Sequence, residues 1–287
     1  MIRSHDLYLA TLSEFAARLD GGRRRTGTIV VGEPDRTGSA VATAYPLGAT
    51  TVLFADPAVA DRLRPLEGDV AISAEEFVAS ASTLGGELVG LGRQRVLDGA
   101  LRPPEADVGD LVFRPLDLDD ALDVERLARL ADDCSDDDVD EADLDLDDLD
   151  PHVSALLAPD GRIAAYAGAR PADIGSATAS IVGTETADVD GAETSDLDAG
   201  LDSGFDDIAV LTHPAFRGRR LGALAVHEFV RHRRAREPRR RFLYRCNAAN
   251  VASNHVAESL GFALVHTIAA VRFTDPPTPG GPDASTT

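Results

Sequence analysis

Residues 206–223 combine the features that binding of a phosphorylated ligand requires. The stretch DDIAVLTHPAFRGRRLGA contains a short apolar run, Ile208 to Thr212, which ends at His213-Pro214 and is typical of a buried strand. A basic loop with Gly218 follows, and from Leu221 apolar residues recur at helical spacing. Such a helix start directs backbone N–H groups and a positive dipole end at one place. The pattern predicts a phosphate or pyrophosphate site; the alternative is an ordinary strand-to-helix turn with surface arginines.

The charge around this loop is opposite to that of the whole chain. Between Pro214 and Arg245 there are eleven arginines and only two acids, although the chain has a net charge of −21. Most arginines in the segment 231–241 are expected on the solvated back of a helix. The loop arginines Arg217, Arg219 and Arg220 are the better candidates for an anion.

A second stretch, residues 241–262, reads RFLYRCNAANVASNHVAESLGF. It predicts another apolar strand, an Asn-rich turn and a short helix, with Gly261-Phe262 as helix end and strand start. Together the two stretches resemble the GCN5-related N-acetyltransferase (GNAT) family. That family's Gln/Arg-x-x-Gly-x-Gly/Ala signature is similar to residues 217–223, and its later Asn-x-x-Ser/Ala pattern is similar to the part that begins at Asn250. The resemblance covers residues 110–273.

The resemblance implies an α/β (α+β) fold with a mixed central sheet flanked by helices. It also implies acetyl-CoA as a co-substrate, an amine acceptor and direct transfer of the acetyl group, with no metal. The strand-end backbone would pair with the pantetheine arm, as an added strand would. The loop would hold the pyrophosphate, and the second stretch would also contact the coenzyme. The implied cofactor-binding residues are Val210, Leu211, Thr212, Arg217, Gly218, Arg219, Arg220, Leu221, Gly222, Ala223, Asn250 and Ser253.

Two positions depart from the family pattern. Arg220 stands where the family has its first signature glycine, and Ala257 stands where the family has the tyrosine that protonates the departing thiolate. Tyr244, Ser253, His255 or water could each supply this proton instead.

A carboxylate is the expected base, because an ammonium group has no lone pair with which to attack a thioester. Asp206, at the start of the central strand, is the preferred catalytic residue, and its neighbour Asp207 should face the opposite side. The alternative is that both carboxylates merely end a loop. His213 is expected to be a turn residue.

The composition is strongly acidic, with 35 Asp, 14 Glu, 28 Arg and no Lys. Such a surface suits a salt-rich cytoplasm, where screening shortens the range of self-repulsion, although high-GC codon bias would also remove lysine. Binding of nucleic acid or of an anionic membrane is not expected. Cys134 and Cys246 are expected as free thiols, and the chain shows no membrane span or signal peptide, so a cytoplasmic protein is predicted.

Three regions are expected. Residues 1–105 form a small α/β domain: a helix over 7–19, strands at 28–31, 40–45 and 51–54, helices at 56–63 and 74–83, and a strand pair within 87–97 that turns at Gly90-x-Gly92. Its role is either to shape the acceptor side or to pair two chains in a homodimer. Residues 110–273 form the acetyltransferase domain, and 274–287 a disordered tail.

The second domain begins with a strand at 111–115 and a helix over 118–131 that buries Leu122, Leu127 and Leu130. An acidic run, 132–150, follows as a solvated segment, or as one that attracts a cationic amine. A hairpin over 152–169 precedes an acidic insertion at 173–205.

The predicted function is acetyl-CoA-dependent N-acetylation of a primary amine on a small molecule or protein N-terminus. The alternative is a non-catalytic acyl-CoA-binding regulatory module. Contact of nucleic acid with the 231–241 segment is a third, weaker possibility.

Overall fold

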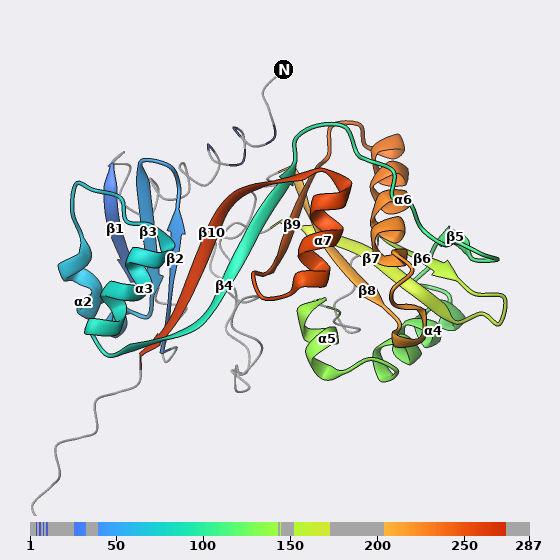
Figure 1. Cartoon of the computed structure of the whole chain (residues 1–287), viewed down its shortest axis with the longest axis horizontal. Helices are drawn as coiled ribbons and strands as arrows, with labels where there is room; N and C mark the ends of the chain where they lie inside the picture. The colour runs from blue at the N-terminus through green and yellow to red at the C-terminus, as the bar shows by residue number, and fades with distance from the viewer. Residues whose placement is uncertain are drawn as a thin grey trace, which may run out of the picture. The chain divides into compact units, whose positions relative to one another are not determined.

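Figure 1 shows the computed structural model of the chain, which describes residues 4, 6, 8, 10, 26–32, 40–142, 144, 152–172 and 204–273. Most of the predicted first helix, nearly all of the acidic insertion and the predicted tail lie outside the described residues. Among the described residues, no helix is long and apolar enough to cross a membrane.

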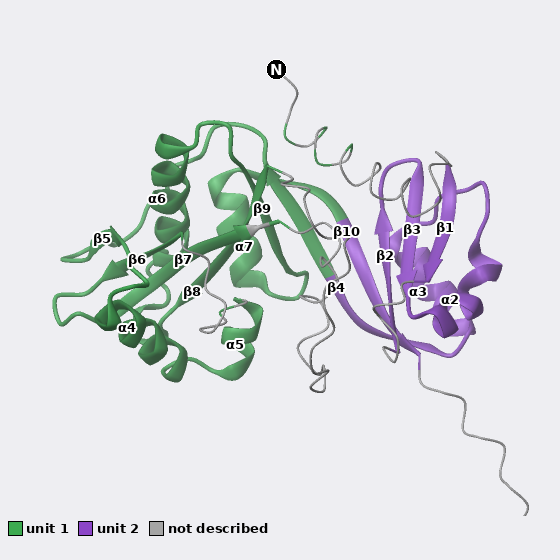
Figure 2. Cartoon of the chain, turned by 180° about the vertical axis from the view of Figure 1, so that it is seen from behind, with its two compact units in different colours: residues 1–11, 92–266 green, residues 12–91, 267–287 purple. Residues whose placement is uncertain are grey.

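The chain divides into two compact units, coloured separately in Figure 2. Unit 1 comprises residues 1–11 and 92–266, and unit 2 comprises residues 12–91 and 267–287. The predicted boundaries 1–105 and 110–273 therefore need correction. Each unit takes part of two long strands, β4 (Gly86–Leu97) and β10 (Phe262–Phe273), so no single linker separates the units.

Unit 2 follows the elements predicted for the N-terminal region. Its strand order is β1-β3-β2-β10. The bounds of β1, β2 and β3, given below, agree with the three predicted strands to within about two residues. Asp56 caps the helix that begins at Pro57, because its Oδ1 accepts the Ala58 N–H at 2.7 Å. The elements are β1 (Gly27–Gly32), β2 (Val41–Pro46), β3 (Thr50–Ala55), α2 (Pro57–Leu63), η2 (Arg64–Leu66) and α3 (Ala74–Thr83).

The predicted strand pair within 87–97 was wrong. Gly86–Leu97 forms one continuous strand, and Gly90 and Gly92 lie inside it instead of in a turn. Neither glycine has a positive φ, so the backbone stays extended through both of them.

Unit 1 contains a mixed sheet with helices on both faces, which confirms the predicted α/β class. Its strand order runs β4-β9-β8-β7-β6-β5, with β8 antiparallel to β7 and parallel to β9. Its remaining elements are β5 (Val112–Pro115), α4 (Ala121–Asp132), α5 (Asp136–Glu141), β6 (Val153–Leu157), β7 (Ile163–Pro171), β8 (Phe205–Thr212), η4 (Pro214–Phe216), α6 (Leu221–Arg236), β9 (Arg241–Asn247) and α7 (Val251–Leu260).

Because successive side chains of β8 point to opposite faces of the sheet, β8 contributes residues to the hydrophobic core on each face. Ile208 and Val210 pack with α6 and α7, whereas Ala209 and Leu211 pack with α4 on the other face. Of the leucines predicted to face inward from α4, Leu127 and Leu130 are buried, but Leu122 is 48% exposed. That prediction was wrong for Leu122 because α4 begins only at Ala121, so this residue lies in its first, outer turn.

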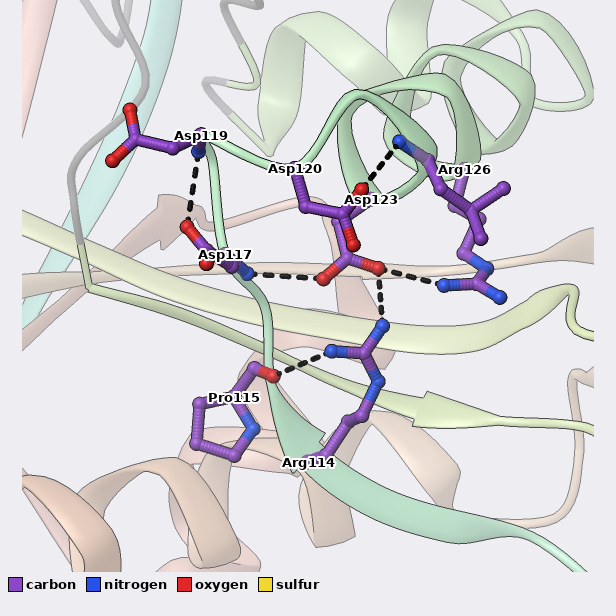
Figure 3. Close-up of polar contacts among 8 residues, drawn as sticks. Arg114, Pro115, Asp117, Asp119, Asp120, Asp123 and Arg126 are labelled. Atoms are coloured by element: carbon purple, nitrogen blue, oxygen red, sulfur yellow. Dashed lines mark hydrogen bonds and ion pairs between the residues drawn. The ribbon is translucent and has the colours of Figure 1, made fainter.

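The first turn of α4 is fixed by the buried carboxylate of Asp123, shown in Figure 3. Arg114 on β5 and Arg126 one turn along α4 both donate to it, Arg126 at 2.7 Å, and the Asp117 N–H donates at 3.0 Å. Burial alone would raise the pKa of Asp123, but these donors outweigh burial and lower it. The network ties the edge strand β5 to α4.

Asp123→Asn should lower the free energy of unfolding by about 2–3 kcal/mol, because two guanidinium groups lose their shared counter-charge. Chemical denaturation in concentrated KCl would measure the difference. Since the folded pKa is lowered, the wild-type advantage should be complete at neutral pH and should shrink as the pH falls below about 4. Asp119→Asn is the matched control, because Asp119 is exposed and only its backbone N–H takes part in the network. Equal stabilities of the two variants would contradict a structural role for Asp123.

Candidate active site

The central strands β8 and β9 are paired at one end and separate at the other. Their parallel register runs from Phe205↔Arg241 to Ile208↔Tyr244 and stops there. Over Ala209 to Thr212, β8 keeps only its β7 partner, although both strands continue. The β8 backbone therefore presents an edge toward β9 on which an extended ligand can form strand-like hydrogen bonds. The Thr212 carbonyl on this segment accepts a bond from Arg217 Nε at 3.2 Å.

The N-terminus of α6 lies directly after this edge. The first intrahelical hydrogen bond runs from the Leu224 N–H to the Arg220 carbonyl at 3.2 Å. The N–H groups of Leu221, Gly222 and Ala223 come before it and therefore have no acceptor within the helix. The Arg220 side chain makes no capping hydrogen bond to them. Free N–H groups and the positive end of a helix dipole are the features that bind anions in other proteins.

The backbone of Arg220 explains why a glycine is expected at this position. Its φ is 60°, in the left-handed region, and Gly218 two residues earlier has φ of 78°. Arginine adopts this conformation at a cost of about 1–2 kcal/mol, which a glycine would avoid. Among the described residues, Arg220 is the only non-glycine residue with positive φ. Strain of this kind is concentrated at ligand-binding turns.

Gly222 allows the helix to approach the end of β8. A Cβ atom added there would lie 2.9 Å from Thr212 Oγ1 and 3.5 Å from Val210 Cγ2. Any side chain would therefore have to displace Thr212, whose backbone borders the open edge.

A cavity of about 920 Å³ connects the open β8 edge, the α6 N-terminus and α7. This volume is near the upper end of the range usual for small-molecule and cofactor sites. Of the predicted site residues, two do not line it, Arg219 and Asp206. Those that do line it are Val210, Leu211, Thr212, Arg217, Gly218, Arg220, Leu221, Gly222, Ala223, Asn250 and Ser253.

Each loop arginine has an acidic partner. Arg217 Nη2 lies 2.9 Å from Asp138 Oδ2 on α5, and Arg220 Nη1 lies 3.8 Å from Glu105 Oε2. Arg219 is directed away from the cavity, where its Nη2 donates to the Asp107 carbonyl at 2.9 Å. A hydrogen bond from Ser135 and the guanidinium of Arg217 hold the pKa of Asp138 below its usual range. An anionic ligand would have to share or displace these partners.

Helix α7 starts at the cavity, and Asn250 is its cap. Asn250 Oδ1 accepts the Ser253 N–H at 2.9 Å, while its Nδ2 donates to Glu141 at the end of α5. The Ser253 hydroxyl also lies 2.9 Å from Tyr244 Oη, and both residues line the cavity. Burial raises the pKa of Tyr244, so this phenol stays protonated at neutral pH.

Helix α7 also carries His255, one of the candidate proton donors, and Ala257, which stands at the position of the family's tyrosine. His255 is exposed and lines the cavity. Ala257 is buried in the core and carries no acidic proton. The buried residues of α7 are Asn254, Ala257 and Leu260. Asn254 is buried because its amide donates to the carbonyls of the turn before α7.

The structure corrects the prediction that Asp206 is the catalytic base. Its carboxylate is only 2% exposed and is held by Arg233 Nε at 3.0 Å and Arg240 Nε at 2.6 Å. It faces α6 at the paired end of β8 and does not line the cavity. Asp207 faces the other side, as predicted, and accepts from Arg245 Nε at 2.5 Å. His213 is the predicted turn residue, with Nδ1 accepting the Ala215 N–H at 3.1 Å.

Sequence reasoning missed the acidic residues that line the cavity. Asp138 and Glu141 belong to the run expected to be solvated or to attract a cationic amine, and no residue of it was singled out, yet both lie on α5 at the cavity. The signal was present in Ser135-x-x-Asp138, which forms a capping box at the start of a short helix. Among the described residues, no group of three or more His, Cys, Asp or Glu residues is arranged to hold a metal ion.

Asp206→Asn should lower the free energy of unfolding by about 3 kcal/mol, because two largely buried guanidinium groups lose their counter-charge. The affinity of the remaining folded protein for coenzyme A should stay unchanged, since Asp206 lies outside the cavity. Thermal unfolding and calorimetric titration would measure these two quantities. Asp110→Asn, at an exposed loop position, is the control. A variant with normal stability but lost turnover would restore Asp206 as the base.

No protein-family model matches the sequence. No curated protein matches it significantly either.

The chain is similar to several solved structures. One is a GCN5-related N-acetyltransferase from Sphaerobacter thermophilus, with 14% identity, a TM-score of 0.46 and coverage of 69% of this chain and 56% of that one. Another is a GNAT-family acetyltransferase from Colwellia psychrerythraea, with 10% identity, a TM-score of 0.42 and coverage of 68% and 62%. A third is a GCN5-related N-acetyltransferase from Kribbella flavida, with 16% identity, a TM-score of 0.39 and coverage of 72% and 65%. The chain thus spans less than two thirds of each of these structures. Their family is the one that the two sequence motifs resemble.

Proposed function

We propose that the chain is an acetyl-CoA-dependent N-acetyltransferase that transfers the acetyl group directly to a primary amine. The acceptor is a small molecule or a protein N-terminus. The observation that carries the proposal is the single cavity into which the open β8 edge, the uncapped α6 N-terminus and the start of α7 all face.

Each part of this cavity suits one part of the coenzyme. The N–H groups of Leu221, Gly222 and Ala223 offer directed donors to a pyrophosphate. The unpaired β8 edge from Val210 to Thr212 offers strand-like partners to the two amides of the pantetheine arm. When bound, the coenzyme supplies an acyl thioester, whose carbonyl carbon is the electrophile for an amine.

The Tyr244–Ser253 pair is the proposed source of the proton that the departing thiolate needs. The two hydroxyls lie 2.9 Å apart, and both residues line the cavity near the point where β8 and β9 separate. Burial raises the pKa of Tyr244, so the phenol carries its proton at neutral pH. This pair takes the role that Ala257 cannot fill.

Ala257 also motivates the alternative function, a non-catalytic module that binds acyl-CoA. It is buried in the core at the position of the family's tyrosine. The two functions differ in turnover and not in binding. Calorimetric binding of acetyl-CoA without thiol release on any amine would favour the regulatory module.

The double variant Arg217→Gln/Gly222→Val should weaken coenzyme A binding by about 10- to 100-fold, which corresponds to loss of one charge-assisted contact and a blocked helix approach. Thiol release from acetyl-CoA across a panel of amines, measured in multimolar KCl, should fall in parallel at subsaturating coenzyme.

Arg239→Gln is the matched control, because it removes the same charge from an exposed turn outside the cavity. If the double variant and the control turned over equally, the site assignment would be wrong.

Asp138→Asn should tighten coenzyme A binding by about two- to fivefold, because it frees Arg217 from an exposed ion pair of the usual modest strength. Asparagine keeps a side-chain oxygen for Ser135, so the α5 cap is retained. Calorimetric titration would detect the change, with Asp137→Asn as a control at a neighbouring exposed position. Weaker binding in Asp138→Asn alone would mean that Asp138 assists the ligand instead of competing with it.

A further inference from the structure

The carboxylates that line the cavity differ in what they contact. Glu105, Asp138 and Glu258 each lie within 4.0 Å of a guanidinium nitrogen, of Arg220, Arg217 and Arg95 respectively. An incoming ammonium group would have to compete with these guanidinium groups for each of the three carboxylates. Glu141 is different: its hydrogen bond comes from the neutral amide of Asn250, and no ion pair to it is found among the described residues. Its carboxylate is therefore not already engaged by a guanidinium group and can pair with an incoming ammonium group.

Glu141 is also placed where an acceptor would meet the reacting end of the cavity. It is the last residue of α5, and the next residue, Ala142, packs in the α4-side core with Leu211 of β8. Its Asn250 contact brings it to the first turn of α7, which carries Ser253. Burial is the main cause of the raised pKa of Tyr244, and the negative charge of Glu141 adds to it. Glu141 and the Tyr244–Ser253 pair thus lie at the same end of the cavity.

The side chain of Glu141 is open to solvent as well. A base that must deprotonate a charged amine in every turnover also has to release that proton afterwards. Exposure gives Glu141 a direct route for this release to bulk water. Asp206, sealed between Arg233 and Arg240, has none.

We propose that Glu141 is the catalytic base that takes a proton from the acceptor's ammonium group; this inference rests on the proposed function. The ammonium gives one proton to the Glu141 carboxylate, and the freed lone pair attacks the thioester carbonyl carbon. A C–N bond forms and the C–S bond breaks. The nitrogen's second proton passes through the Ser253 hydroxyl to the departing sulfur, so Ser253 ends with the proton it began with. Glu141 returns its proton to water, so ammonium and thioester yield amide, thiol and one proton.

The test compares Glu141→Gln with Asp140→Asn in the full chain. Glutamine keeps an oxygen for the Asn250 amide, so it removes the base without removing the contact. Asp140 precedes Glu141 on the same helix, is exposed and does not line the cavity, so its substitution makes the same charge change. In Glu141→Gln, kcat should fall by about 100-fold or more, as expected for loss of a general base, while calorimetric affinity for coenzyme A stays unchanged.

The pH profile separates a catalytic role from a structural one. Wild-type kcat/KM should reach a plateau well below the pKa of the amine, because the enzyme itself removes the amine's proton. In Glu141→Gln it should keep rising toward the pKa of the amine itself, so that high pH rescues the variant. Glu141→Asp should retain part of the activity.

If the wild type failed to bind coenzyme A, the proposed function would fall, and this inference with it. Wild-type turnover with equal kcat and equal pH profiles in Glu141→Gln and Asp140→Asn would overturn the role of Glu141 alone. If Glu141→Gln lost the same fraction of kcat/KM at every pH, the role of Glu141 as the base would also be overturned. Removal of a general base has to change the dependence of kcat/KM on pH.

Discussion

The buried carboxylate of Asp206 is the constraint on which the geometry of the site depends. Through Arg233 and Arg240 it ties β8 to α6 and to the turn before β9, on the side where β8 and β9 are paired. Beyond Ile208 the two strands separate, and Gly222 lets the start of α6 lie against Thr212. One strand is thus fixed at one end and open at the other, which places its free backbone edge beside an uncapped helix terminus.

In this strongly acidic chain, the cavity does not rely on free positive side chains. The three loop arginines, Arg217, Arg219 and Arg220, all have an acidic partner. Molar salt weakens such exposed pairs and long-range attraction alike. Backbone N–H donors at a helix start are less affected, because they act by short, directed bonds. A site built on amides would therefore suit a chain with 35 Asp, 14 Glu and no Lys at high salt concentration.

Local patterns predicted most of the fold and most of the residues that the structure brings together at the cavity. The motif from Arg217 to Ala223 specifies a loop and a helix start within a few residues, so its geometry follows from the sequence. Asp206 was different, because its position in a strand indicated which face it occupies but not what packs there. Its partners Arg233 and Arg240 lie 27 and 34 residues further along the chain. Glu141 was missed because an acidic run has the same composition whether it is solvated or forms a cavity wall.

The path of β4 limits how this protein can be divided. Residues Gly92 to Val96 pair with Leu243 to Asn247 of β9, although they precede the proline-rich segment at Pro103-Pro104 that suggests a domain boundary. A fragment cut at that segment would leave β9 as a bare sheet edge, open to pairing with other chains. Expression of the fragment that follows the apparent linker would therefore give a product that aggregates. Addition of the missing β4 strand as a separate peptide should prevent this aggregation.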